Sequence, residues 1–286
     1  PPGGPNAPVF YSMIELTGET APRQLGPSSD TTPFIISEIM YHPADSAGSN
    51  NLEYIEIFNT DPVPRDISGY RISGDADYRF PSGTIMQFRS YLVVASDPSA
   101  VQQDYGISNV VGPLRNNLPN NGGTVRLRNH VDALMLEVNY GDRMPWPKGA
   151  DGTGHSLQLH SPDYGEDDVR AWGPSALVGG SPGKFEPPPV DALRGVVINE
   201  YLAHTDLPEV DYIELYNSGT QSVDISGCGI SNTLTTNEYV VPPATILPPG
   251  GFVFYEQETL GFSLRAGGDE IYLWAPDFSY IVDAVE

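Results

Sequence analysis

Short runs that alternate apolar and polar residues dominate this chain, and the clearest of them occurs twice. Leu52–Gly69 reads LEYIEIFNTDPVPRDISG and Val210–Gly227 reads VDYIELYNSGTQSVDISG, with eight of eighteen aligned positions identical and no gap. The two copies start 158 residues apart (210 − 52). This spacing is far longer than the repeat of a solenoid, so it indicates two whole domains in tandem.

Within each copy the apolar pattern has a period of two. Ile55 and Ile57 alternate with an aromatic–Glu–aromatic row, and Ile213 and Leu215 do the same in the second copy. Because side chains alternate across a strand, the pattern predicts equivalent strands at Tyr54–Phe58 and Tyr212–Tyr216 with the aliphatic residues in the core. Turn-forming residues follow each run, so the repeated unit is a strand, a turn and a second strand.

Other apolar runs also match in pairs between the two halves. Both copies open on a strand with a Glu in its middle, and later runs end in glycine turns. The matched pairs are Phe34–Pro43 with Val196–His204, Phe80–Ile85 with Val241–Ile246, Tyr91–Ala95 with Gly251–Tyr255, and Asn121–Leu127 with Ala266–Leu273. Six or seven short strands separated by turns predict a β-sandwich with Greek-key connections in each copy.

The composition supports an all-β chain of two domains. The chain has 286 residues with 30 Gly and 28 Pro, and no segment shows a sustained helical period or an apolar run long enough to span a membrane. We expect an N-terminal extension at residues 1–33, a first sandwich at 34–186, a Pro-rich linker at 187–194 and a second sandwich at 195–286. The first 33 residues contain one more predicted strand, Val9–Leu16.

The second copy stops near the equivalent of Asn139, whereas the first continues through Tyr140–Gly183. We therefore expect an open sheet edge in the second sandwich, covered by Val9–Leu16 of this or another molecule or by a neighbouring domain. The alternative is that the part without a counterpart is mostly loop and the core strands are complete.

Three groups of residues together resemble the lamin tail domain. They are a first strand with Asn-Glu (Ser37-Glu38 and Asn199-Glu200 here), the run Tyr-Ile-Glu-Leu-x-Asn and the run Asp-Ile-Ser-Gly. The first copy continues with Trp146-Pro147, Asp151–Leu157, Trp172–Ser175 and Gly179–Gly183, a series similar to the bacterial branch of the family. The resemblance implies an immunoglobulin-like fold, no catalytic residue and a role as a module of extracellular or cell-envelope proteins.

Charge narrows the choice of partners. The net charge is −23, and residues 190–286 contain only two bases, Arg194 and Arg265. Because affinity for nucleic acid depends on Lys and Arg that displace counterions, this balance argues against a nucleic-acid partner. It indicates a solubilising surface or, alternatively, a surface that loads divalent cations or meets a cationic partner.

Few residues carry candidate chemistry. Glu38 with Glu56, or Glu200 with Glu214, could act as an acid–base pair in a hydrolase, but their presence in both copies favours a structural role. Cys228 is the single cysteine; it precludes an intrachain disulfide and is expected to be a small buried hydrophobe.

Metal-binding signals are weak. The five His residues show no ligand spacing, although His42 and His204 occupy similar positions. Asp151–Gly154 resembles part of a calcium loop and reads better as a turn. Asp163, Glu166, Asp167 and Asp168 form the densest acidic cluster, which is either a solvated loop or a calcium site.

The sequence therefore predicts a non-catalytic binding or spacer module of a larger bacterial secreted or cell-surface protein. Its expected partners are other domains of the parent protein, a cell-surface protein or a glycan. The alternatives are a carbohydrate- or cation-binding accessory of an attached hydrolase, and a hydrolase that uses Glu38 and Glu56. We expect no cofactor, except calcium at the acidic cluster.

Overall fold

A computed structural model describes residues 32–44, 51–160, 165–186, 191–203, 205, 209–234 and 239–286. The chain divides into two compact units at Pro188 and Pro189. Domain 1 denotes the described residues up to 186, and domain 2 denotes those from 191 onward. The predicted strand Val9–Leu16 and His204 lie outside the described residues.

The elements are bounded as follows. Domain 1 contains β1 (Phe34–Met40), β2 (Tyr54–Asn59), β3 (Arg65–Asp66), β4 (Arg71–Gly74), β5 (Tyr78–Arg79), β6 (Ile85–Met86), β7 (Tyr91–Ala95), α1 (Pro98–Tyr105), β8 (Val110–Val111), β9 (Gly123–Arg128), β10 (Leu134–Tyr140), η2 (Lys148–Ala150), β11 (Leu157–Leu159), η4 (Val169–Ala171) and β12 (Trp172–Pro174). Domain 2 contains η5 (Ala192–Gly195), β13 (Val196–Leu202), β14 (Tyr212–Asn217), β15 (Val223–Asp224), β16 (Gly229–Ser231), β17 (Tyr239–Val240), β18 (Ile246–Leu247), β19 (Phe252–Glu256), α2 (Gln257–Leu260), β20 (Ile271–Trp274), η6 (Pro276–Phe278) and β21 (Ile281–Val285).

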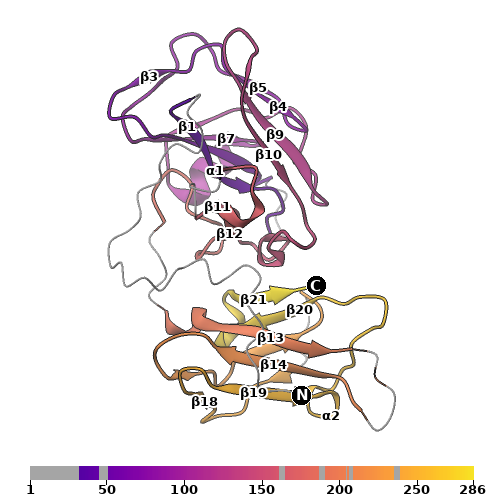
Figure 1. The fold of residues 1–286 in the computed structure, drawn as a ribbon. Helices are drawn as coiled ribbons and strands as arrows, with labels where there is room; N and C mark the ends of the chain where they lie inside the picture. Colours follow the sequence, from indigo (N-terminus) through magenta and orange to yellow (C-terminus); the bar gives the residue numbers. More distant parts are fainter. Residues whose placement is uncertain are drawn as a thin grey trace. The chain divides into compact units, whose positions relative to one another are not determined.

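Domain 1 is a sandwich of two main sheets (Figure 1). One sheet has the order β12-β11-β1-β2-β7-β8 and the other has the order β10-β9-β4-β5. Their inner faces share one apolar core, in which Ile55, Ile57, Val125 and Leu127 are fully buried. The predicted all-β sandwich is therefore confirmed.

Domain 2 repeats this architecture. Its sheets have the orders β13-β14-β19 and β17-β16-β20-β21, and Ile213, Leu215 and Leu273 are fully buried between them. β2 and β14 have the predicted alternation, with their aliphatic residues in the two cores. The predicted equivalence of these strands is confirmed.

The repeated Asp-Ile-Ser-Gly run forms the same turn in both domains. Ile67 is fully buried, while the Asp66 carboxylate accepts a hydrogen bond from the Ser68 N–H at 2.8 Å. Gly69 has φ of 73°, a left-handed conformation that glycine adopts without steric cost. Asp224, Ser226 and Gly227 reproduce this arrangement in domain 2, so local backbone geometry accounts for the repeated run.

A β-bulge lies at the Glu in each opening strand. The pairing of β1 with β2 shifts between Ile36 and Glu38, and that of β13 with β14 shifts between Ile198 and Glu200. A bulge sets two residues of one strand opposite one of the other. It brings Ser37 and Glu38 to the outer face of the sheet, which explains a Glu in the middle of an apolar strand.

Helices were not expected, but the described residues include two short α-helices. α1 begins after Asp97, whose carboxylate accepts hydrogen bonds from the N–H groups of Ser99 and Ala100, and ends at Gly106 with φ of 64°. The dipeptide Asp97-Pro98 followed by Gly106 is a start and stop signal, but the helix is too short for an apolar period to show. Its Val101 packs with Val93 and Val110 in a second small core, so it covers the outer face of the β1–β2–β7 region.

Residues 191–195, at the end of the predicted linker 187–194, have a defined structure. Residues 192–195 form η5, where the Asp191 carboxylate accepts a hydrogen bond from the Leu193 N–H. Leu193 is buried in the core of domain 2. The buried side chain of Leu193 makes this segment part of the second domain. The neighbouring prolines in the sequence had indicated a linker instead.

Candidate functional site

The most concentrated chemistry is a pair of buried carboxylates on the outer face of β1 and β2. Glu38 and Glu56 lie opposite each other in the strand pairing and are 0% and 1% exposed. Glu38 Oε1 accepts hydrogen bonds from Tyr54 Oη at 2.7 Å and Ser156 Oγ at 2.5 Å. Glu56 Oε1 accepts one from Ser37 Oγ at 2.6 Å.

A glycine-rich segment closes this pair from outside. The N–H of Ser181 donates to Glu38 Oε1 at 2.9 Å, and the N–H of Gly183 donates to Glu56 Oε2 at 2.6 Å. Gly180 has φ of 78°, and a Cβ there would overlap the Glu38 carboxylate. The Gly-Gly-Ser-Pro-Gly run is therefore needed for a close approach of backbone to carboxylate.

Burial dominates the protonation of the pair. It raises the pKa of Glu38 from 4.5 to about 7, although the hydrogen bonds from Ser156, Tyr54 and Ser181 lower it. Burial, followed by the charge of Glu38, raises the pKa of Glu56 well above 4.5. Two carboxylates side by side in a dry site disfavour the charged form of each other. Shifts of this kind occur at catalytic sites and in structural networks alike.

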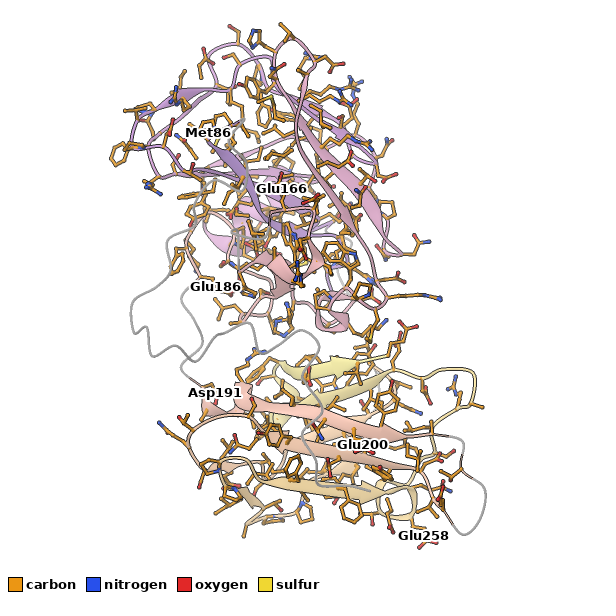
Figure 2. The ribbon with its side chains drawn as sticks, viewed as in Figure 1. Met86, Glu166, Glu186, Asp191, Glu200 and Glu258 are labelled. Carbon is orange, nitrogen blue, oxygen red and sulfur yellow. The ribbon has the colours of Figure 1, made fainter. Side chains whose placement is uncertain are left out.

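Domain 2 contains an equivalent pair of carboxylates with fewer described hydrogen-bond partners. Glu200 lies opposite Glu214, Tyr212 Oη donates to Glu200 Oε1 at 2.5 Å, and Asn199 Nδ2 donates to Glu214 Oε1 at 2.8 Å. Asn199 thus does what Ser37 does in domain 1. Glu214 is 1% exposed, and no described group hydrogen-bonds its Oε2. Glu200 is half-buried on the β13–β14–β19 sheet (Figure 2).

This geometry does not suit catalysis in domain 1. The polar contacts of Glu38 and Glu56 come from the protein's own hydroxyl and N–H groups, which leaves no described opening for a substrate. A cavity of about 400 Å³ lies at residues 85–92, and one of about 510 Å³ lies beside Asp191 and Tyr280 in domain 2. Neither cavity is lined by a member of the two carboxylate pairs.

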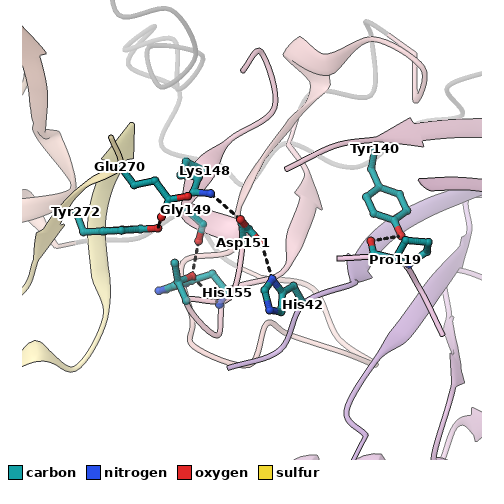
Figure 3. A network of polar contacts seen from close by, with 10 residues as sticks. His42, Pro119, Tyr140, Lys148, Gly149, Asp151, His155, Glu270 and Tyr272 are labelled. Atoms are coloured by element: carbon teal, nitrogen blue, oxygen red, sulfur yellow. Dashed lines mark hydrogen bonds and ion pairs between the residues drawn. The ribbon is translucent and has the colours of Figure 1, made fainter. Parts of the chain in front are cut away.

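His42, Asp151 and Lys148 form a separate charged cluster (Figure 3). His42 Nδ1 lies 2.5 Å from Asp151 Oδ1, and Lys148 Nζ donates to Asp151 Oδ2 at 2.7 Å. Burial raises the pKa of Asp151, but the hydrogen bonds from His42 and Lys148 outweigh it and lower the pKa below 3.8. Asp151 therefore links His42, just after β1, to Lys148 of η2, which gives the Asp151–Gly154 stretch a structural role.

The acidic cluster predicted as a calcium site is dispersed where it is described. Asp163 lies outside the described residues, Glu166 is buried and Asp167 is exposed. The Asp168 carboxylate accepts from the Arg170 N–H at 2.9 Å and forms an ion pair with the Arg170 guanidinium at 2.5 Å. Across the described part of the chain, no three His, Cys, Asp or Glu side chains are placed to share a metal ion.

Cys228 is fully buried in the core of domain 2, as expected for a small apolar side chain. Burial raises the pKa of its thiol to about 12. The helices among the described residues are all too short or too polar to cross a membrane.

A comparison with protein families identifies the family of the two domains. The model of the lamin tail domain matches residues 27–142 and 189–285, which is most of the chain in two separate segments. The chain belongs to the lamin tail domain family. The lamin tail domain is an immunoglobulin-like β-sandwich, so the resemblance, the fold class and the tandem arrangement expected from the sequence are confirmed.

Other comparisons add little to the lamin tail assignment. No curated protein matches the chain. One solved structure, described as the exo-β-D-glucosaminidase CsxA, matches with 12% identity and a TM-score of 0.21. The match covers 89% of this chain but only 26% of that one, and a likeness this low carries no argument about activity.

The sequence pointed to both carboxylate pairs but not to their surroundings. In domain 1 the pair lies on an outer sheet face that the segment with Gly180, Ser181 and Gly183 covers. Ser156 and Ser181 follow Glu38 by 118 and 143 residues, and Gly183 follows Glu56 by 127 residues. In the sequence, the only indication of these contacts is the Gly-rich run that follows β12.

Proposed function

We propose that this chain is a non-catalytic binding or spacer module of a larger secreted or cell-surface bacterial protein. The observation that supports it is the closure of Glu38 and Glu56 by Ser156, Ser181 and Gly183. A hydrolase would need the same carboxylates to be open to its substrate. The partners we propose are other domains of the parent protein or a cell-surface protein, and the acidic surface argues against nucleic acid.

A screen against glycosidase, esterase and phosphodiesterase substrates tests this proposal. We expect no turnover from the full chain, and Glu56→Gln should alter stability alone. Activity that disappears in Glu56→Gln, while the exposed-residue variant Asp104→Asn retains it, would overturn the non-catalytic assignment.

A second candidate is carbohydrate binding, because aromatic side chains gather on one face of domain 2. Tyr216 stacks on Phe252 with ring centroids 4.5 Å apart, and Tyr212 meets Phe254 edge-on at 6.2 Å. Phe254 is 47% exposed. Exposed aromatic rings on a sheet favour contact with sugar faces. A glycan array probed with the full chain and with Phe254→Ser tests this, since a true glycan site would lose its signal in the variant.

A further inference from the structure

The two domains differ in how the outer face of the repeated sheet is covered. In domain 1, β11 pairs with β1 through Glu38 and Ile39, and the segment from Gly179 to Gly183 lies over the carboxylates. The described part of domain 2 contains no strand on the equivalent side of β13, which is the end strand of its sheet.

Exposure follows this difference at matching positions. Ile39 is 0% exposed and its counterpart Tyr201 is 43% exposed. An exposed sheet edge of this kind is a template for another strand.

The first half of the β13 edge is already occupied. The Asp283 carboxylate on β21 accepts a hydrogen bond from the Ile198 N–H at 2.8 Å. The remaining half, Glu200–Leu202, corresponds to Glu38–Met40, where β11 binds in domain 1. There the Tyr201 hydroxyl donates to the Glu286 carbonyl oxygen at 3.0 Å, which leaves the backbone of β13 without a paired strand on this side among the described residues.

The buried Glu214 gives a second, independent observation. Its Oε2 corresponds to Glu56 Oε2, which accepts the Gly183 N–H in domain 1, yet no described group hydrogen-bonds it. A buried carboxylate oxygen without a donor is costly. Glu38 Oε2 in domain 1 is also without one, so the difference between the domains is that no described group takes the place of the Gly183 N–H at Glu214. Glu200 likewise has the donor from Tyr212 but no described counterpart of Ser156 or Ser181.

We propose that domain 2 binds an extended segment of a partner polypeptide with the chemistry of residues 156–183. Its strand pairs antiparallel with Glu200–Leu202, and a following Gly/Ser-rich loop donates backbone N–H groups to Glu200 and Glu214. Its apolar side chains cover Tyr201, as Leu157 of β11 covers Ile39 in domain 1. Domain 1 supplies the template, because it makes each of these contacts within one chain.

The probe is a synthetic peptide of residues 154–186 added to the full 286-residue chain. Binding is measured by calorimetry, and the site is mapped by hydrogen exchange at the amides of residues 200–202. We expect slowed exchange there. Methylation of the peptide nitrogens at positions 181 and 183 should weaken binding at least about tenfold, because each removes a donor to a carboxylate.

The protein variants complete the test. Glu200→Gln with Glu214→Gln should weaken binding by a similar factor, whereas Glu258→Gln on the exposed face of α2 should not change it. If the double variant fails to fold, the methylated peptides still decide the matter, because they leave the protein unchanged.

Three outcomes of the peptide experiment would overturn the proposal. They are no binding at millimolar peptide, protection mapped to β1 instead of β13, and residues 200–202 already protected before peptide is added. The last would mean that another segment of this chain or a second copy occupies the edge. Binding of a glycan that requires Phe254, without peptide binding, would also overturn it. The inference rests on the proposed function as a binding module, but the two fail in different ways. An absence of peptide binding rejects only the strand-binding site on domain 2. Turnover that depends on Glu56 rejects the non-catalytic function itself.

Discussion

Replacing Glu38 by Gln should remove a large part of the pH dependence of domain 1 stability. The pKa of Glu38 is about 7 in the folded state and 4.5 in the unfolded chain. Between these values the folded protein keeps a proton that the unfolded chain releases, so the free energy of unfolding falls as pH rises. A shift from 4.5 to about 7 corresponds to roughly 3 kcal/mol.

Glutamine has no proton to lose, and its Oε1 can still accept from Tyr54, Ser156 and Ser181. The stability of Glu38→Gln should therefore stay nearly level between pH 5 and 8, apart from the share that Glu56 contributes in the same direction. The variant should overtake the wild type as pH increases, because only the wild type must hold a buried charge.

Urea denaturation at pH 5, 6, 7 and 8 measures this effect. A Trp274→Phe background leaves Trp146 and Trp172, both in domain 1, as the fluorescent reporters. Asp104→Asn, an exposed change on α1, serves as the control and should follow the wild type. Parallel stability curves for wild type and Glu38→Gln would refute the reasoning, since they would show that Glu38 does not change protonation on folding.

Four further predictions concern packing, backbone, the thiol and calcium. Ile213→Ala should cost domain 2 roughly 2–5 kcal/mol in urea denaturation, as other buried large-to-small changes do, and a loss under about 0.5 kcal/mol would contradict its core position. Gly180→Ala should destabilise domain 1 by more than Gly83→Ala, because both have positive φ but only Gly180 touches Glu38; equal losses would contradict the close approach. Cys228 should react with a thiol reagent only after denaturation, and fast labelling of native protein at pH 8 would contradict its burial. Calcium binding at Asp163–Asp168 stays a prediction; it requires a melting temperature that rises with calcium and returns with chelator, and identical curves reject it.

The repeated segments made the fold predictable because their patterns are local. The alternation at Ile55 and Ile57 involves only neighbouring residues, and so does the turn at Asp66–Gly69. Each pattern occurs in both copies, which supports the prediction made from it. The covered outer face was not predictable in the same way. The cover over Glu38 depends on Ser156 and Ser181, which lie more than a hundred residues further along the chain. No local sequence pattern indicates such a long-range contact.

The bulge in each opening strand also determines which single deletion these domains can tolerate. With Ser37 removed, Ile36 would still face Ile57 and Glu38 would still face Glu56, so every side chain would keep its side of the sheet. The cost would be one hydroxyl contact to Glu56 and the local twist. Deletion of Ile36 instead would place the Ser37 hydroxyl opposite Ile57, at a position that faces the core. Residue 37, and residue 199 in the second domain, are therefore the positions at which we expect the opening strand to lose one residue at the lowest cost.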